Sequence, residues 1–140
     1  MPTHITTTFD FDRIAFHTIT SEHGSTRLPG AMTTEAEFKG AEMAGKAVTH
    51  FATIAYGPDD GDKAFHGISV FTGSILGKAG SVAFTIAGQV PNGTELVETD
   101  YVLLPSSASG ELKGIKGTGR AVGAPGQQEG IVVTFDVEFA

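Results

Sequence analysis

The sequence contains no cysteine, so it can form no disulfide and offers neither a thiol nucleophile nor a cysteine-based metal site. It also contains no run that approaches the ~20 apolar residues of a membrane helix. The first residues have neither the basic region nor the apolar core of a signal peptide. These absences are compatible with a reducing compartment, and we expect a soluble, cytoplasmic protein with no membrane partner.

Basic residues are few. Nine Lys and Arg face sixteen Asp and Glu, which gives a formal net charge of −7. Nucleic acid and anionic membranes repel such a chain, so we expect neither as a partner. A small neutral, apolar or cationic ligand suits this charge better, and we expect an apolar small molecule. At 140 residues the chain has the size of one domain, which we place at 1–140.

Glycine is abundant: the 19 glycines amount to about twice the average usage of ~7% and follow no collagen-like period. Together with other turn formers they separate runs of β-branched and aromatic residues. In residues 65–84 two such runs flank a Gly77 to Gly80 turn, which predicts a β-hairpin. Eight strands are predicted, at residues 6–16, 33–39, 47–56, 65–76, 81–89, 94–104, 111–122 and 131–139. Turns or loops are predicted at 21–30, 57–61, 91–93, 105–109 and 123–130.

One segment, residues 34–48, competes as a helix because it is rich in Ala, Glu and Lys. Its two glycines, Gly40 and Gly45, would each cost about 1 kcal/mol relative to Ala in a helix interior, and its apolar residues form no clean stripe. We therefore favour strands here. Eight short strands with turns between them predict an all-β antiparallel barrel or sandwich. Closure into a barrel is attractive because it removes the sheet edges.

Three groups of residues carry a resemblance to a known family. They are Phe65-His66-Gly67-Ile68 with Thr72-Gly73-Ser74, the turn from Gly77 to Ser81, and the glycine-rich stretch from Ser109 to Gly119. In order and spacing they resemble the bacterial domain-of-unknown-function 3224 family over nearly the whole chain. The last stretch is also similar to its counterpart in allene oxide cyclases. The resemblance implies an eight-stranded antiparallel, allene-oxide-cyclase-like barrel, often oligomeric, with room inside for one small molecule. It does not imply allene oxide cyclisation.

The chain departs from the family pattern at two positions where acidic residues are frequent. Ser69 and Phe51 stand there, so an inward orientation would make this interior less charged than usual. Strand alternation places Phe51, Thr53, Phe65, Ser69 and Phe71 on one face and His50, Ile54, Tyr56, His66, Ile68 and Val70 on the other. Both faces are apolar enough to be buried. The outward face of a barrel then needs a cover, which predicts a homodimer or higher homo-oligomer.

Candidate catalytic groups have plain structural alternatives. His50 and His66 share a face of adjacent predicted strands and could form a general base with a polar partner, or lie satisfied at an interface or rim. Tyr101 could donate a hydrogen bond to a ligand oxygen, or pack with its hydroxyl in water. Glu98 and Asp100 share a face and could act as an acid and base pair, although solvent exposure is the simpler interpretation.

Motifs for other chemistries are missing. No HxH or HExxH occurs, so we expect no metal, and no GxSxG occurs to organise a hydrolase triad. Residues 114–119, GIKGTG, suggest a phosphate loop, but no helix pattern follows as a nucleotide fingerprint requires, and bulges in a barrel strand are the better explanation. We expect no cofactor.

Two classes of function stay open. The first is a cofactor-independent isomerase or cyclase that uses the shape of a cavity and one or two polar groups. The second is a ligand carrier or structural oligomer without chemistry. For either class the predicted ligand-binding residues are Phe51, Ser69, Phe71 and Tyr101. The predicted catalytic residues are His50, His66 and Tyr101.

Overall fold

The structure is a computed structural model that describes residues 2–18, 30–56, 62–90, 96–124 and 127–140. It contains eight strands and, in these ranges, no helix. The strands are β1 (Thr3–Thr18), β2 (Gly30–Lys39), β3 (Met43–Tyr56), β4 (Asp62–Ile75), β5 (Lys78–Val90), β6 (Val97–Gly110), β7 (Ile115–Gly123) and β8 (Ile131–Phe139). The helix alternative for 34–48 is thereby excluded, because those residues form β2, the start of β3 and the turn between them.

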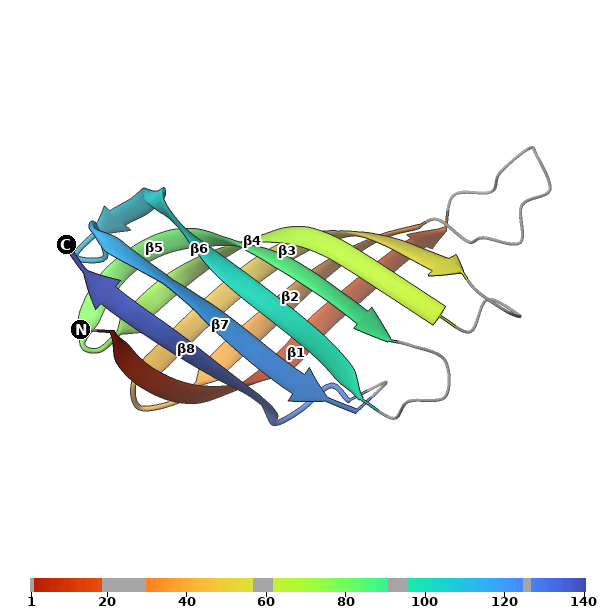
Figure 1. Cartoon of the computed structure of the whole chain (residues 1–140), viewed down its shortest axis with the longest axis horizontal. Helices are drawn as coiled ribbons and strands as arrows, with labels where there is room; N and C mark the ends of the chain where they lie inside the picture. Colours follow the sequence, from red (N-terminus) through yellow and green to blue (C-terminus); the bar gives the residue numbers. More distant parts are fainter. Residues whose placement is uncertain (1, 19–29, 57–61, 91–95, 125–126) are drawn as a thin grey trace.

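The strands form a closed antiparallel barrel in which each strand pairs with the next in sequence and β8 pairs back with β1 (Figure 1). This confirms the predicted all-β, eight-stranded antiparallel barrel. Because every connection joins neighbours, the barrel has two distinct ends. One end carries the chain termini and the short β2–β3, β4–β5 and β6–β7 turns, and the other carries the remaining connections. No helix long and apolar enough to cross a lipid bilayer occurs in the described ranges.

The observed bounds differ from the predicted ones in every strand except β8, and three of these differences change where a turn or loop lies. The β4–β5 turn consists of Leu76 and Gly77, whereas the predicted turn runs from Gly77 to Gly80. Both turn residues have positive φ, as a two-residue type I′ hairpin turn requires. Residues 105–109 belong to β6, although the pairing with β5 is interrupted there between Leu104 and Ser109. Residues 111–114 form the turn before β7 rather than its start. The predicted loops at 57–61 and 91–93, and most of 21–30, lie outside the described residues.

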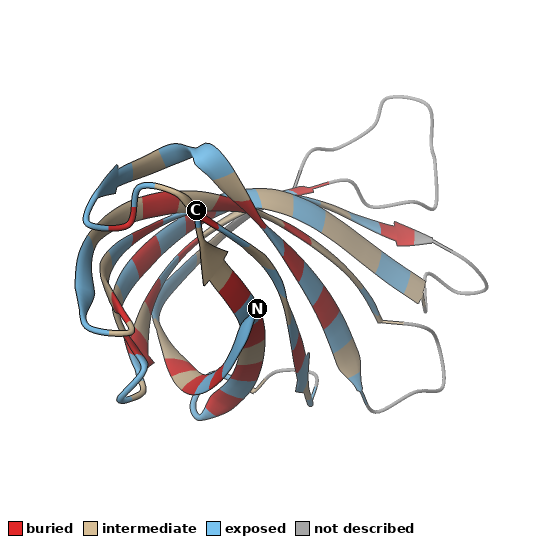
Figure 2. Ribbon diagram, turned by 60° about the vertical axis from the view of Figure 1, so that its left-hand side comes forward, coloured by how far each residue is buried: buried red, intermediate tan, exposed pale blue. Residues whose placement is uncertain are grey.

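Burial alternates along the strands with a period of two, as Figure 2 shows by its red and blue bands. The face with Phe51, Ser69 and Phe71 points into the barrel, and the face with Ile68 and Val70 points out and is exposed. The predicted division into two faces is therefore confirmed, and the structure shows which face is the inner one.

The end with the termini is filled by a packed core. Its inward side chains include Phe71, Ile75, Val82, Leu112 and Ile115, all of which are almost completely buried. Leu112 comes from the turn between β6 and β7, so this turn closes the barrel at that end. The space inside the barrel is consequently restricted to the other end.

Three inward-facing glycines lie under phenylalanine rings of the neighbouring strand. The cross-strand pairs are Gly67 with Phe51, Gly88 with Phe65, and Gly119 with Phe135. A Cβ on Gly67 would lie 2.7 Å from Phe51 Cδ1 and closer still to the carbonyl oxygen of His50. The bulges predicted at 114–119 are not seen in the β7–β8 ladder, which pairs without a register shift from Ile115 to Ala121, and the β6–β7 pairing begins only at Thr118. Within this stretch Gly119 makes room for the Phe135 ring, whereas a Cβ on Gly117 would meet the Asp136 carbonyl oxygen.

Candidate functional site

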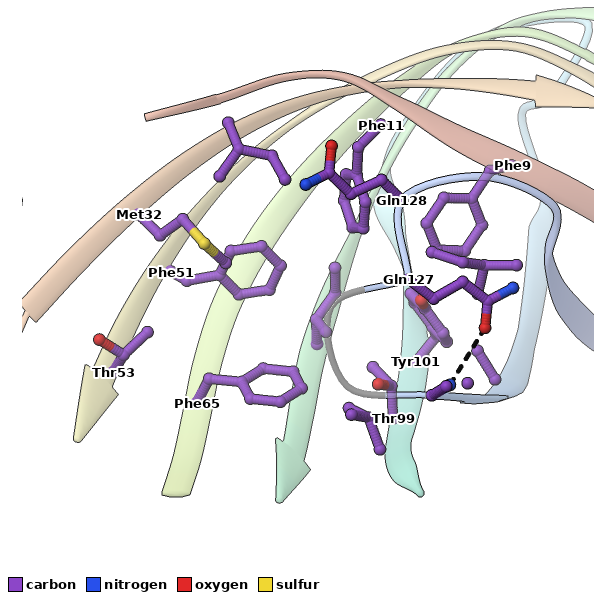
Figure 3. Close-up of a pocket in the computed structure, with 17 residues that line it drawn as sticks. Phe9, Phe11, Met32, Phe51, Thr53, Phe65, Thr99, Tyr101, Gln127 and Gln128 are labelled. Carbon is purple, nitrogen blue, oxygen red and sulfur yellow. Dashed lines mark hydrogen bonds between the residues drawn. The ribbon is translucent and has the colours of Figure 1, made fainter. Parts of the chain in front are cut away.

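A cavity of about 280 Å³ opens at the end of the barrel opposite the termini (Figure 3). Five aromatic side chains, from Phe9, Phe11, Phe51, Phe65 and Tyr101, form much of its wall. The other lining residues are Ile14, Met32, Thr53, Ile86, Val97, Thr99, Ala121, Gly123, Ala124, Gln127, Gln128 and Ile131. None of these residues carries a formal charge at neutral pH, so the cavity suits an uncharged molecule.

The rings of the wall hold one another by edge contacts. The Phe51 and Phe65 rings, from β3 and β4, are 5.6 Å apart at an interplanar angle of 89°. The Phe9 and Phe11 rings, both from β1, are 5.3 Å apart at 87°. Edge-to-face pairs of this kind are favourable beyond their burial. The aromatic wall is therefore preorganised rather than dependent on a ligand for its shape.

A short segment before β8 completes the wall and is attached to β1. The Phe11 backbone N–H donates to the Gln128 carbonyl over 2.7 Å, and the Gly130 N–H donates to Asp10 Oδ1, also over 2.7 Å. Gln127 Oε1 accepts from the Ala124 N–H at 3.0 Å, the dashed line of Figure 3, so this amide stabilises the segment itself. Two polar side chains thereby reach the mouth of an otherwise apolar cavity.

Asp10 is also held by Lys39 on β2, whose Nζ lies 2.7 Å from Asp10 Oδ2. The hydrogen bond from Lys39 and that from the Gly130 N–H keep the pKa of Asp10 below its usual value. This carboxylate lies outside the cavity lining. It connects β1, β2 and the segment before β8, and so helps to position the wall.

A smaller void of about 30 Å³ shares part of its lining with the larger cavity. Phe9, Phe11, Phe51, Ile86 and Tyr101 line both spaces. Three further residues of the small void carry hydroxyl groups: Thr34, Thr49 and Ser69. The interior is thus apolar except for a few hydroxyl groups.

Tyr101 supplies the phenol of this interior. Its ring packs 5.5 Å from the rings of both Phe84 and Phe135. Burial raises the pKa of the Tyr101 hydroxyl far above its ordinary value. The phenol is therefore neutral at physiological pH and can donate a hydrogen bond, but it does not serve as a base.

The four predicted ligand-binding residues have different positions. Phe51 and Tyr101 line both spaces, and Ser69 lines the small one. Phe71 lines neither, because it lies deeper, in the packed half, where its ring contacts Phe38 at 5.5 Å. Phe71 is therefore a core residue and not a cavity residue.

The two predicted catalytic histidines are outside the barrel. His50 and His66 occupy outward positions of β3 and β4, and both are exposed. His50 pairs with Ile68, and its Nδ1 lies 3.1 Å from Thr33 Oγ1. The prediction that they act as proton-transfer groups in the cavity needs correction, because strand alternation directs both imidazoles away from it. Of the three predicted catalytic residues, Tyr101 alone lines the cavity.

The carboxylates of β6 are also on the outer surface. Glu98 Oε2 lies 3.2 Å from Arg120 Nη2, and both side chains are more than half exposed. Asp100 is exposed and pairs across the strands with Arg120. Glu98 and Asp100 are therefore solvent-exposed carboxylates rather than an acid and base pair of the cavity. Among the described residues, no three His, Asp or Glu side chains gather as a metal site would require.

Several cavity residues were not predicted as site residues. Phe65 and Thr53 had been placed on the same face as Phe51, so alternation alone could have identified them. Phe9 and Phe11 likewise alternate in β1. Gln127 and Gln128 had no signal in the sequence, because a glutamine in a predicted loop is ordinary and only closure of the barrel brings this segment over the cavity.

Comparisons with known proteins agree with this fold. The family model described as "Protein of unknown function (DUF3224)" matches residues 5–135. Among solved structures, the chain is similar to a protein of unknown function from the DUF3224 family of Shewanella oneidensis MR-1, with a TM-score of 0.77 and 20% identity over 100% of this chain and 99% of that one. No curated protein matches the chain. At 20% identity the structural likeness shows the fold alone. Because the family model covers most of its length, the chain belongs to the DUF3224 family.

Proposed function

We propose that this protein binds a small apolar molecule in the open end of its barrel. The observation that carries the proposal is the cavity of about 280 Å³ with its aromatic wall and uncharged lining. Pockets for small molecules usually measure roughly 300–1,000 Å³ and are mostly apolar with a few placed polar groups. This cavity is at the lower limit of that range, so the ligand is small.

The chemistry of the lining favours binding without proton transfer. Among the described residues of the lining, Tyr101 is the titratable one, and burial keeps its phenol neutral. A general base needs a pKa near the working pH, which a buried phenol does not have. A carrier or a ligand-sensing role therefore agrees best with the geometry.

A cofactor-independent isomerase or cyclase is the second candidate, and one observation favours it. The neutral Tyr101 phenol is buried against apolar side chains of the cavity wall, where a hydrogen bond to a substrate oxygen is stronger than in water. Such an enzyme would act by holding a reactive substrate in a folded shape. Tyr101 would then be the polar group that steers the reaction.

A matched pair of variants tests ligand binding. Ala121 lines the cavity, whereas Ala52 is exposed on the outer face of β3. We expect propylbenzene to bind the parent and Ala52→Leu equally, and to bind Ala121→Leu at least about tenfold more weakly, because the added carbons occupy the cavity. Isothermal titration calorimetry measures the three constants. Equal binding by Ala121→Leu and the parent would show that the cavity is not the site.

Mass spectrometry of organic extracts from the purified protein would identify a natural ligand and distinguish the two candidates. An extracted molecule that the parent leaves unchanged on prolonged incubation supports a carrier. Conversion by the parent, with a slower rate in Tyr101→Phe, supports an isomerase or cyclase.

Two other expectations from the sequence are retained as proposals. We propose a cytoplasmic location, supported by the absence of cysteine. We also propose a homo-oligomer, supported by the exposed apolar side chains Ile54, Ile68 and Val70 on the outer face. The formal charge of −7 argues against nucleic acid and anionic membranes as partners.

A further inference from the structure

We propose that Thr34, Thr49 and Ser69 form a binding site for the oxygen atom of a neutral alcohol or carbonyl compound whose apolar body fills the larger cavity. The inference rests on the proposed function, since it needs a ligand in that cavity. It adds the chemical class of the ligand and the direction in which the ligand enters. These three residues are called the hydroxyl row below.

The hydroxyl row is continuous across three strands. Thr34 of β2 pairs directly with Thr49 of β3, and Thr49 pairs directly with Ser69 of β4. All three face inward, with exposed fractions of 1%, 4% and 1%. Directly paired residues on one face of a sheet have Cβ atoms about 4.5–5.5 Å apart, so one small polar group can reach the hydroxyls of Thr34 and Thr49, or those of Thr49 and Ser69.

The hydrogen bonds within the row are incomplete. Thr49 Oγ1 donates to Ser69 Oγ over 2.8 Å. Thr34 Oγ1 is buried and has no hydrogen-bond partner among the described residues. Thr7, an equally buried inward threonine, differs because its Oγ1 donates to the Met43 carbonyl over 2.8 Å. Buried hydroxyls are normally paired, so the unpaired Thr34 hydroxyl indicates a partner that arrives from elsewhere.

The void beside the row has the right size and position for such a partner. It measures about 30 Å³, which exceeds the roughly 10–15 Å³ that one water-sized group needs. It shares Phe9, Phe11, Phe51, Ile86 and Tyr101 with the larger cavity. A ligand in the larger cavity can therefore place one terminal oxygen at the row while its body contacts the aromatic wall.

The ligand oxygen must be neutral. Among the residues that the structure describes, no Lys, Arg, His, Asp or Glu lines either space, so a carboxylate or ammonium group would be buried there without an opposite charge, at a large desolvation cost. Hydroxyl groups both donate and accept. The row thus suits a carbonyl oxygen, which accepts, and an alcohol, which does both.

Three probes with the same carbon skeleton test this proposal: propylbenzene, 3-phenylpropan-1-ol and 3-phenylpropanoate. We expect the parent to bind the alcohol about tenfold more tightly than the hydrocarbon, and to bind the carboxylate more weakly than either. Titration calorimetry or ligand-observed NMR measures the three dissociation constants. Only the polar group differs between the probes, so the ratios of their dissociation constants report on the hydroxyl row.

Variants then assign the preference to the row. In Thr34→Val/Ser69→Ala we expect the alcohol and hydrocarbon to bind within about twofold of each other. Thr99→Val is the matched control, because Thr99 is a buried threonine of the larger cavity outside the row, and it should keep the tenfold preference. Should the double variant not fold, Thr34→Val alone removes the unpaired hydroxyl and is expected to lose most of the preference.

The outcomes separate this inference from the function on which it rests. If the parent binds none of the probes, the proposed cavity function fails and the inference fails with it. If the parent binds hydrocarbon and alcohol equally, or the row variants keep the preference, the cavity function stands and the hydroxyl row is overturned as its oxygen site.

Discussion

Thr34 and Thr49 are paired neighbours of the same type and similar burial, yet their hydroxyls have different surroundings. The Thr49 hydroxyl has a partner in Ser69, and the Thr34 hydroxyl has none. Removing a paired buried hydroxyl loses a hydrogen bond, whereas removing an unpaired one relieves a desolvation cost. Substitutions at Thr34 and Thr49 should therefore have different effects on the free energy of unfolding, although both residues belong to the hydroxyl row.

We expect Thr34→Val to leave the ligand-free protein as stable as the parent or about 1 kcal/mol more stable, because the unpaired hydroxyl disappears at nearly constant volume. Thr49→Val is expected to lose about 1 kcal/mol, since it leaves Ser69 without its donor. Urea unfolding followed by circular dichroism gives both values. Equal losses for the two variants would contradict this hydrogen-bond assignment.

At the level of the strands, pairing of glycine with phenylalanine shapes the cavity wall. Gly67 and Gly88 leave space on β4 and β5 into which the rings of Phe51 and Phe65 lean from the neighbouring strand. A side chain at either glycine would push its ring toward the interior. The abundance of glycine in this sequence is in part a packing requirement of the inner face.

Gly67→Ala tests this packing. The new Cβ would collide with the His50 carbonyl and the Phe51 ring, so we expect a loss of about 1–3 kcal/mol in the free energy of unfolding and weaker binding of propylbenzene. Gly123→Ala serves as the control, because the nearest atom to its Cβ would be Gln127 Oε1 at 3.3 Å and that side chain can move. Thermal unfolding should leave the control near the parent.

The Asp10 carboxylate connects β1, β2 and the segment before β8, so the stability of this connection depends on pH. Because its pKa is lowered in the folded state from an ordinary 3.8, the unfolded chain takes up the proton first as the pH falls. The stabilisation that ionised Asp10 provides is complete at pH values well above its ordinary pKa of 3.8. It is lost as the pH falls through the folded-state pKa. Asp10→Asn should therefore be less stable than the parent near neutral pH, and the difference should shrink as the pH falls from 3.8 through the folded-state pKa. Urea midpoints across this range measure it; a constant difference would contradict the assignment.

On the scale of the whole molecule, apolar side chains lie on both surfaces of the barrel wall. Ile68 and Val70, on the outer face of β4, are 55% and 50% exposed. Val48 of β3 pairs directly with Val70. Val102 of β6 lies in the same cross-strand row as Ile68, with Thr85 of β5 between them. These four residues form an exposed outer patch. Exposed apolar patches can mark protein–protein interfaces, and closed two-fold association is the commonest way to cover one.

We expect a homodimer at tens of micromolar protein, with the outer patch in the interface. Ile68→Lys/Val70→Lys should dissociate it without loss of the far-ultraviolet strand signal, because both positions point outward. Val132→Lys, at an equally exposed valine on β8 across the barrel, is the control and should stay dimeric. Light scattering after size exclusion measures the molar mass of each variant. A parent with the mass of a monomer would contradict the proposal.

The sequence by itself determined the elements and the division of each strand into two faces. Alternation of side chains is a local property of an extended chain, so Phe51, Ser69 and Phe71 could be grouped before any strand was placed. Turn residues similarly located most connections. Both faces of β3 and β4 are apolar, however, and no local rule states which one the barrel encloses.

The tertiary structure decided the rest. Ring closure turned His50 and His66 outward, and packing of the terminus end around Leu112 placed Phe71 in the core and left the cavity at the opposite end. The hydroxyl row exists because cross-strand register sets Thr34, Thr49 and Ser69 side by side. Register depends on hydrogen bonds between segments that are distant in sequence, so a site made of one residue from each of several strands is visible only when the strands are paired.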